Sequence, residues 1–77
     1  MKTYVFRAEL QEEDDGRWSS WIDALPGCAA CGYSQEEALL ALKDAAEAFG
    51  EDMVEAGEEL PTNGVQVIEA PVVAFTV

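Results

Sequence analysis

Apolar and polar residues alternate along residues 2–10 of the chain. One face of this segment carries Tyr4, Phe6, Ala8 and Leu10. An alternation with a period of two is typical of a β-strand that buries one face. The acidic segment at residues 11–16 follows, and its Gly16 can adopt the positive φ that a turn requires. The pattern therefore predicts a strand that ends in a polar loop.

A second strand is predicted over residues 17–22, again with a period of two. Trp21 lies on one face of it, and the other face carries Trp18, Ser20 and Ile22. Pro26 and Gly27 end this strand, because proline cannot donate a hydrogen bond to a sheet and glycine permits a sharp turn. The small apolar residues at 28–33 predict a short third strand, and Gly32 near its end allows a close backbone approach.

A helix is predicted to begin after Ser34. The sequence Ser-Gln-Glu-Glu at residues 34–37 forms a capping box, in which the Ser34 hydroxyl accepts from the Glu37 N–H and the Glu37 carboxylate accepts from the Ser34 N–H. Beyond it, apolar residues recur at every third or fourth position, and this stripe comprises Ala38, Leu42, Ala45, Phe49, Met53 and Ala56. Gly57 is a favourable residue for the helix end.

Two β-rich segments follow the helix, at residues 65–68 and 72–77, with Pro71 between them. The last segment could pair within the main sheet or with a neighbouring subunit. The order β-β-β-α-β predicts an α+β domain of two layers, with one helix packed on an antiparallel sheet. The 77 residues, of which 49% are hydrophobic, are expected to form a single domain over residues 1–77.

The charge of the chain is strongly negative. Sixteen acidic residues stand against four basic ones, for a formal net charge of −12. Such a surface repels phosphate, so we expect no direct nucleic-acid binding, and it favours a basic protein partner. No apolar run approaches the roughly 20 residues of a membrane span, and no signal peptide is evident, so we expect a cytoplasmic protein. The absence of histidine excludes histidine-based acid–base catalysis.

Cys28 and Cys31 have the Cys-x-x-Cys spacing of redox centres and metal sites. A thioredoxin-like centre places its first cysteine at the start of a helix, whereas the predicted helix begins only after Ser34. A structural zinc site needs four ligands, which one chain without histidine does not supply, although a dimer could provide four thiolates. We therefore expect both cysteines to pack as small, buried or half-buried apolar residues. Thiol redox or metal chemistry remains the alternative from the enzyme class.

The carboxylates of the first loop do not predict catalysis. They are consecutive, at Glu12, Glu13, Asp14 and Asp15, whereas a catalytic pair must converge from different elements. We predict no catalytic residue, metal site or cofactor. Trp18 is expected in the core, and Trp21, which faces the other way, is a candidate anchor for a protein partner.

The polar face of the predicted helix is mostly acidic. It carries Glu36, Lys43, Asp44, Glu47 and Glu51. Leu40 and Val54 project from the same face, about 21 Å apart along the axis. They are either scattered surface residues or part of a contact with a partner or a second copy.

Taken in order, these features resemble the N-terminal domain of the HicB-type antitoxin family over most of the chain. The positions that carry the resemblance are Gly16, Trp18, Leu25, Pro26, Gly27, Cys28, Gly32, Ser34, Glu36, Glu37, Ala38, Ala45, Gly57, Leu60 and Pro61. The resemblance implies a partial ribonuclease-H-like fold without catalytic carboxylates. Many members carry a C-terminal DNA-binding domain, which we do not expect within residues 1–77. Cys31 is not characteristic of the family.

The resemblance also implies a non-enzymatic function. HicB proteins neutralise HicA, a small basic toxin that cleaves mRNA, and an acidic antitoxin complements such a partner in charge. We expect contacts at Glu12, Glu13, Asp14, Asp15, Trp21, Glu36, Leu40, Glu47 and Glu51. The alternative is an orphan oligomeric module without a toxin, which would self-associate through its C-terminal strand or the Leu40 and Val54 face. A homo-oligomer is expected in either case.

Overall fold

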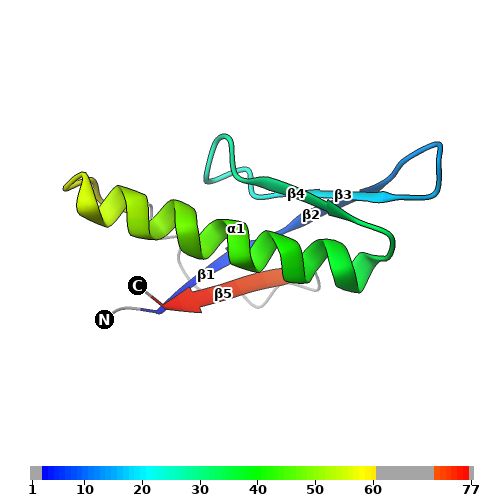
Figure 1. The fold of residues 1–77 in the computed structure, drawn as a ribbon. Helices are drawn as coiled ribbons and strands as arrows, with labels where there is room; N and C mark the ends of the chain where they lie inside the picture. Colours follow the sequence, from blue (N-terminus) through cyan, green and yellow to red (C-terminus); the bar gives the residue numbers. More distant parts are fainter. Residues whose placement is uncertain (1–2, 61–70, 77) are drawn as a thin grey trace.

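The computed structural model describes residues 3–60 and 71–76. Within these ranges the elements are β1 (Thr3–Arg7), β2 (Glu9–Glu12), β3 (Trp18–Trp21), β4 (Ala29–Gly32), α1 (Gln35–Glu55) and β5 (Val72–Thr76). Figure 1 shows α1 lying across one side of the strands. The predicted α+β architecture, with one helix packed on antiparallel strands, is confirmed. In the part of the chain that the structure describes, no helix is long and apolar enough to cross a membrane.

The first predicted strand is divided in two at Ala8. β1 pairs with β5, whereas β2 pairs with β3 and β3 pairs with β4, always antiparallel. The Ala8 amide donates to the Pro71 carbonyl at 2.9 Å, so the chain stays extended while its hydrogen-bonding partner changes. Figure 1 shows β1 and β2 following one line, with β5 beside one half and β3 beside the other. The predicted alternation holds across this break, because Tyr4, Phe6, Ala8 and Leu10 are all buried or half-buried.

The C-terminal strand pairs within its own chain. Tyr4 lies opposite Phe75 in β5, and Phe6 lies opposite Val73. The ring centroids of Phe6 and Phe75 are 5.7 Å apart, and both side chains are buried. For residues 72–76, this pairing decides between the two alternatives for the C-terminal segment. The other β-rich segment, at residues 65–68, lies outside the described residues.

The N-terminal cap of α1 differs in one hydrogen bond from the predicted capping box. The Glu37 amide donates to the Ser34 hydroxyl at 3.1 Å, as predicted. The Glu37 carboxylate accepts from the amide of Tyr33 at 2.9 Å, one residue earlier than the expected Ser34 amide. Both bonds satisfy amides at the start of the helix, so the cap has its expected effect.

At the other end, Gly57 has a φ of +75° and ends the helix as predicted. Its amide donates to the Val54 carbonyl, and the Glu58 amide donates to the Met53 carbonyl. These two bonds form a Schellman motif, which satisfies carbonyls of the last turn.

The buried side of α1 is shifted from the predicted stripe. Its fully buried residues are Ala38, Leu42, Ala46 and Gly50. The predicted residues Ala45, Phe49 and Met53 are half-buried against the core. The prediction of Ala56 was wrong, because this residue is the exposed C-cap. Three of the four fully buried residues are small, and the larger side chains of Phe49 and Met53 pack against the core from the flank of the helix.

Two small residues bring the helix close to the sheet. Gly32 ends β4, and a Cβ atom there would lie 2.6 Å from the Ala38 nitrogen, well inside van der Waals contact. Ser20 in β3 is fully buried, and its hydroxyl donates to the Ala38 carbonyl at 2.9 Å. The start of α1 is therefore held over β3 and β4. Trp18, expected in the core, is half-buried at the start of the central strand β3 and lies outside the main core cluster.

Candidate functional site: the acidic helix face and hairpin

The acidic loop is a tight hairpin turn between β2 and β3. The Glu13 amide donates to the Arg17 carbonyl at 2.7 Å, and the Gly16 amide donates to the Glu13 carbonyl at 3.0 Å. Gly16 has a φ of +86°, the left-handed conformation that three-residue hairpin loops favour. The turn therefore presents its carboxylates at one end of the molecule.

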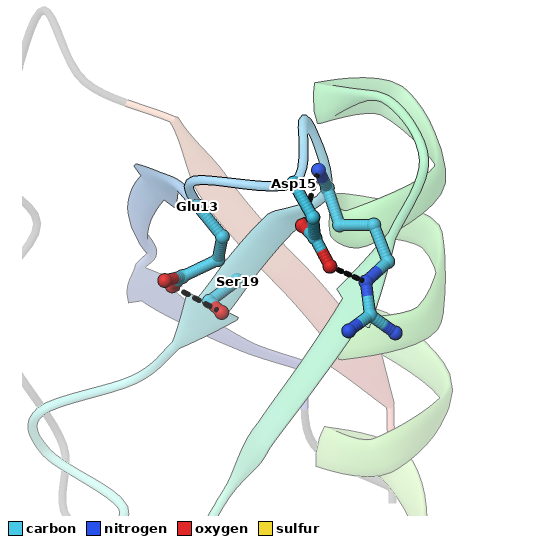
Figure 2. A network of polar contacts seen from close by, with 4 residues as sticks. Glu13, Asp15 and Ser19 are labelled. Atoms are coloured by element: carbon cyan, nitrogen blue, oxygen red, sulfur yellow. Dashed lines mark hydrogen bonds and ion pairs between the residues drawn. The ribbon is translucent and has the colours of Figure 1, made fainter.

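Two of these carboxylates accept hydrogen bonds within the hairpin, as Figure 2 shows. Asp15 accepts from the Arg17 amide at 3.0 Å and from the Arg17 Nε at 2.7 Å. These bonds hold the pKa of Asp15 below its usual value of 3.8. The hydrogen bond from the Arg17 amide has the larger effect, and the bond from its guanidinium has the smaller one. The carboxylate of Glu13 accepts from the Ser19 hydroxyl at 2.8 Å. These two acidic groups are thus partly satisfied within the hairpin.

Glu12 and Asp14 differ from these two. Both are exposed, and neither has a side-chain hydrogen bond or ion pair within residues 3–60 and 71–76. Of the four loop residues predicted to contact a partner, these two are the better placed to do so.

Trp21 lies on the side of the sheet that faces away from α1. It is half-buried, and its indole N–H donates to the Asp23 carboxylate at 3.0 Å. Its neighbour Ser20 points to the helix, so the alternation of the strand places Trp21 on the opposite side. Trp21 is therefore separated by the sheet from the helix residues with which it was grouped.

The remaining predicted contacts form one stripe on α1. With about 100° of rotation per residue, Glu36, Leu40, Glu47 and Glu51 fall within a sector of roughly 60°. Leu40 is 65% exposed, Glu36 and Glu51 are exposed, and Glu47 is half-buried. The stripe runs about 22 Å along the helix axis. We call this surface, defined by these four residues, the acidic helix face.

The charge on α1 is higher than these four residues indicate. The helix has seven acidic residues and a single basic one, Lys43. Both ion pairs in the described ranges, Arg7–Glu9 and Arg17–Asp15, lie in the strands and the hairpin, so none neutralises the helix. The sequence prediction of contacts omitted Asp52 and Glu55, although the excess of acidic residues near the helix end was visible in the sequence.

This charge is unfavourable for the helix itself. The last turn contains no basic residue, although positive charge there would complement the helix dipole. Glu47, Glu51 and Glu55 are spaced four residues apart, and like charges at that spacing destabilise a helix by about 0.2–0.5 kcal/mol per pair. The fold alone therefore does not account for the acidic residues on this surface.

The predicted contacts thus occupy three places rather than one. The hairpin lies at the same end of the molecule as the start of α1, because β4 returns from the far end before the helix begins (Figure 1). Glu36 belongs to this end, whereas Glu51 lies near the other end of the helix. Trp21 is on the opposite side of the sheet.

The two cysteines point in opposite directions. Cys28 is buried in the core, whereas Cys31 is exposed, so the expectation of a buried or half-buried thiol was wrong for Cys31. Residues three apart in an extended chain project to opposite faces. One disulfide or one metal ion would require both thiols on one side. Within the described residues, no three potential metal ligands gather into a cluster. Burial raises the pKa of the Cys28 thiol, which disfavours the reactive thiolate.

Comparison with solved structures defines the class of fold. The chain is similar to the N-terminal domain of the antitoxin HicB of Burkholderia pseudomallei, with a TM-score of 0.73 and 17% identity over 95% of this chain and 96% of that domain. It is also similar to the complete antitoxin HicB of that organism, with a TM-score of 0.69 and 16% identity, and spans 64% of its length. The fold is therefore that of a HicB N-terminal domain, as the sequence resemblance implied.

The sequence comparison identifies the family. The chain is 30% identical over 59 residues to a UPF0150 protein of Thermoplasma acidophilum, a match that covers 77% of this chain and 86% of that protein. The chain belongs to this HicB-like UPF0150 family. No family model matches it.

Proposed function

We propose that this protein is a non-enzymatic antitoxin that binds and neutralises a basic, mRNA-cleaving toxin of the HicA type. The fold supports the proposal, because the similar solved structures are of an antitoxin. The observation that carries it is the acidic helix face, whose carboxylates have no ion-pair partner in the described residues and destabilise the helix that presents them. A basic partner supplies the missing counter-charges.

The proposed mechanism is occlusion. A toxin that cleaves mRNA needs a positive surface to hold phosphates, and an acidic helix can occupy that surface in place of RNA. Glu36, Glu47 and Glu51 supply charge along about 22 Å of helix, and Leu40 supplies an apolar contact among them. Glu12 and Asp14 extend the negative surface at the hairpin end. A cytoplasmic location is part of this proposal, because mRNA cleavage occurs there.

The test is binding to the basic protein encoded beside this gene. The wild-type chain is expected to co-purify with it, and co-expression is expected to restore growth to cells that produce it. Glu51→Lys is expected to weaken binding by about tenfold or more. Asp23→Lys is the control, because it changes the net charge equally at an exposed site away from the helix, and it is expected to weaken binding less. Equal loss in both variants would contradict a specific helix interface, and the lack of any basic partner would contradict the antitoxin function.

The alternative function is an orphan oligomeric module without a toxin partner. β5 is paired with β1 of its own chain, so this strand is not exchanged with a second copy. Leu40 and Val54 remain exposed, at 65% and 54%, and keep the helix face available for a second copy. Light scattering of Leu40→Lys distinguishes the two functions, because a toxin-binding helix face leaves the oligomeric state of this variant unchanged.

A further inference from the structure

The strands form a two-stranded sheet, β1–β5, and a three-stranded sheet, β2–β3–β4, and α1 does not cover the side of them that faces away from it. Along each strand, residues that face the helix alternate with residues that face away from it. The strand register therefore identifies the residues that lie side by side on the uncovered side. Along β1 and β5 the neighbours are Val5 opposite Ala74 and Arg7 opposite Val72. The molecule measures 39 × 27 × 17 Å along its principal axes, and its smallest dimension fits one helix layer on one sheet layer.

The outward side chains continue across the other strands. Arg7 forms an ion pair with Glu9 at 3.1 Å, and Glu9 lies opposite Trp21 in β3. Trp21 in turn lies opposite Ala29 in β4. We call the resulting surface the open sheet face, and define it by its apolar residues Val5, Val72, Ala74, Trp21 and Ala29.

This face differs from the helix face in both polarity and charge. Val5 and Val72 are 46% and 48% exposed, and Ala74 and Ala29 are also exposed. Among the charged groups beside them, Arg7 and Glu9 neutralise each other, and Asp23, which accepts from the Trp21 indole, adds one negative charge. The acidic surplus of the chain is concentrated instead on α1 and at the hairpin tip.

The charge distribution indicates which occupant fits. A basic partner gains most from the acidic helix face and less from an apolar face with a single surplus carboxylate. Two copies of this chain, each with a net charge of −12, repel each other unless they meet where acidic residues are few. A two-fold arrangement places each apolar residue against the same surface of the other copy, as symmetric dimers do.

We propose that the open sheet face is an interface between two copies of this chain. Val5, Val72 and Ala74 form its apolar centre, and Trp21 with Ala29 extends it across the three-stranded part of the sheet. The helix faces then point outward on opposite sides of the dimer and remain accessible to other partners. Trp21, expected at first to contact a toxin, contacts the second copy instead. This inference does not depend on the existence of a toxin.

Sedimentation equilibrium over a micromolar concentration series tests the interface. The wild-type chain is expected to approach twice the mass of one chain. Val5→Lys is expected to weaken association by about tenfold or more, and the matched control Leu40→Lys, which makes an equivalent change at an exposed helix position, leaves it unchanged. Ala74→Arg provides a second disruption of the same face. Circular dichroism verifies that each variant is folded.

Salt dependence gives an independent readout. Raising the ionic strength from about 0.1 M to about 0.5 M screens the repulsion between acidic copies, so the dimer is expected to tighten or stay unchanged. A wild-type chain that is monomeric at all concentrations would overturn the proposal. A dimer that Leu40→Lys disrupts while Val5→Lys and Ala74→Arg do not would also overturn it.

Discussion

The hydroxyl of Ser20, in the middle of β3, donates a hydrogen bond of 2.9 Å to the carbonyl of Ala38 in the first turn of α1. Ser20 is completely buried and is the buried polar residue of the described core. The bond connects the sheet to the helix at Ala38, the residue whose backbone nitrogen also lies close to Gly32. This contact fixes the position of the helix, and with it the direction in which the acidic helix face points.

Removal of this hydroxyl is expected to destabilise the fold. Ser20→Ala should lower the free energy of unfolding by about 0.5–1.5 kcal/mol, the net contribution of one hydrogen bond. Ser19→Ala is the control, because Ser19 is half-exposed and bonds only to the hairpin carboxylate of Glu13, and a change within about 0.5 kcal/mol is expected. Denaturant titration measures both. Equal effects would show that Ser20 does not hold the helix.

A side chain at Gly32 is expected to displace the helix. In Gly32→Ala the new Cβ would lie 2.6 Å from the Ala38 nitrogen and 2.7 Å from the Glu37 Cβ, so the helix must shift. We expect a loss of about 1–3 kcal/mol in the free energy of unfolding. Gly57→Ala tests the effect of a positive φ without crowding, because no atom apart from those of its chain neighbours lies within 4 Å of the added Cβ. We expect this conformation to cost about 1–2 kcal/mol. Only Gly32→Ala should also weaken binding through the helix face.

The two cysteines are expected to react at different rates. Cys31 is exposed and should be alkylated readily in the native protein, whereas Cys28 is buried with a raised pKa and should react only after unfolding. Mass spectrometry of the partly alkylated chain distinguishes them. Equal reactivity, or a native disulfide between them, would contradict the placement of the thiols on opposite faces.

The raised pKa of Cys28 also predicts a pH dependence. Because the folded-state pKa lies above the ordinary value of 9.0, burial of the neutral thiol stabilises the protein fully below that pH, and this stability is lost as pH rises through the folded-state pKa. Wild type should therefore lose more stability than Cys28→Ala between about pH 7 and about pH 10. Parallel pH curves for the two proteins would contradict this prediction.

Much of the fold follows from sequence periodicity. The alternation in the first strand, the Ser34 cap and the Gly57 stop correspond to local rules, and each occurs in the structure. The change of partner at Ala8 was not predictable, because alternation reports which face is buried and carries no information about which strand lies alongside. The alternation placed Ser20 on the same face as Trp18 and Ile22, but its complete burial was not predicted, because a serine gives no hydrophobic signal of its own.

The candidate site was less predictable than the fold. The sequence indicated an acidic surface, but the grouping of Trp21 with the helix residues depended on the three-dimensional arrangement. The opposite orientations of Cys28 and Cys31 were predictable from their spacing, because side chains three residues apart along a strand point to opposite faces. The same spacing on a helix would have placed both thiols on one face.

The central claim is that α1 carries its acidic face for a basic partner rather than for its own stability. The most direct measurement is of Glu51→Lys, which replaces a carboxylate repelled by Glu47 and Glu55. We predict that this variant unfolds at a higher temperature than wild type and binds the basic partner at least about tenfold more weakly, with the wild-type affinity falling as salt is raised. A variant that binds as tightly as wild type would contradict the claim.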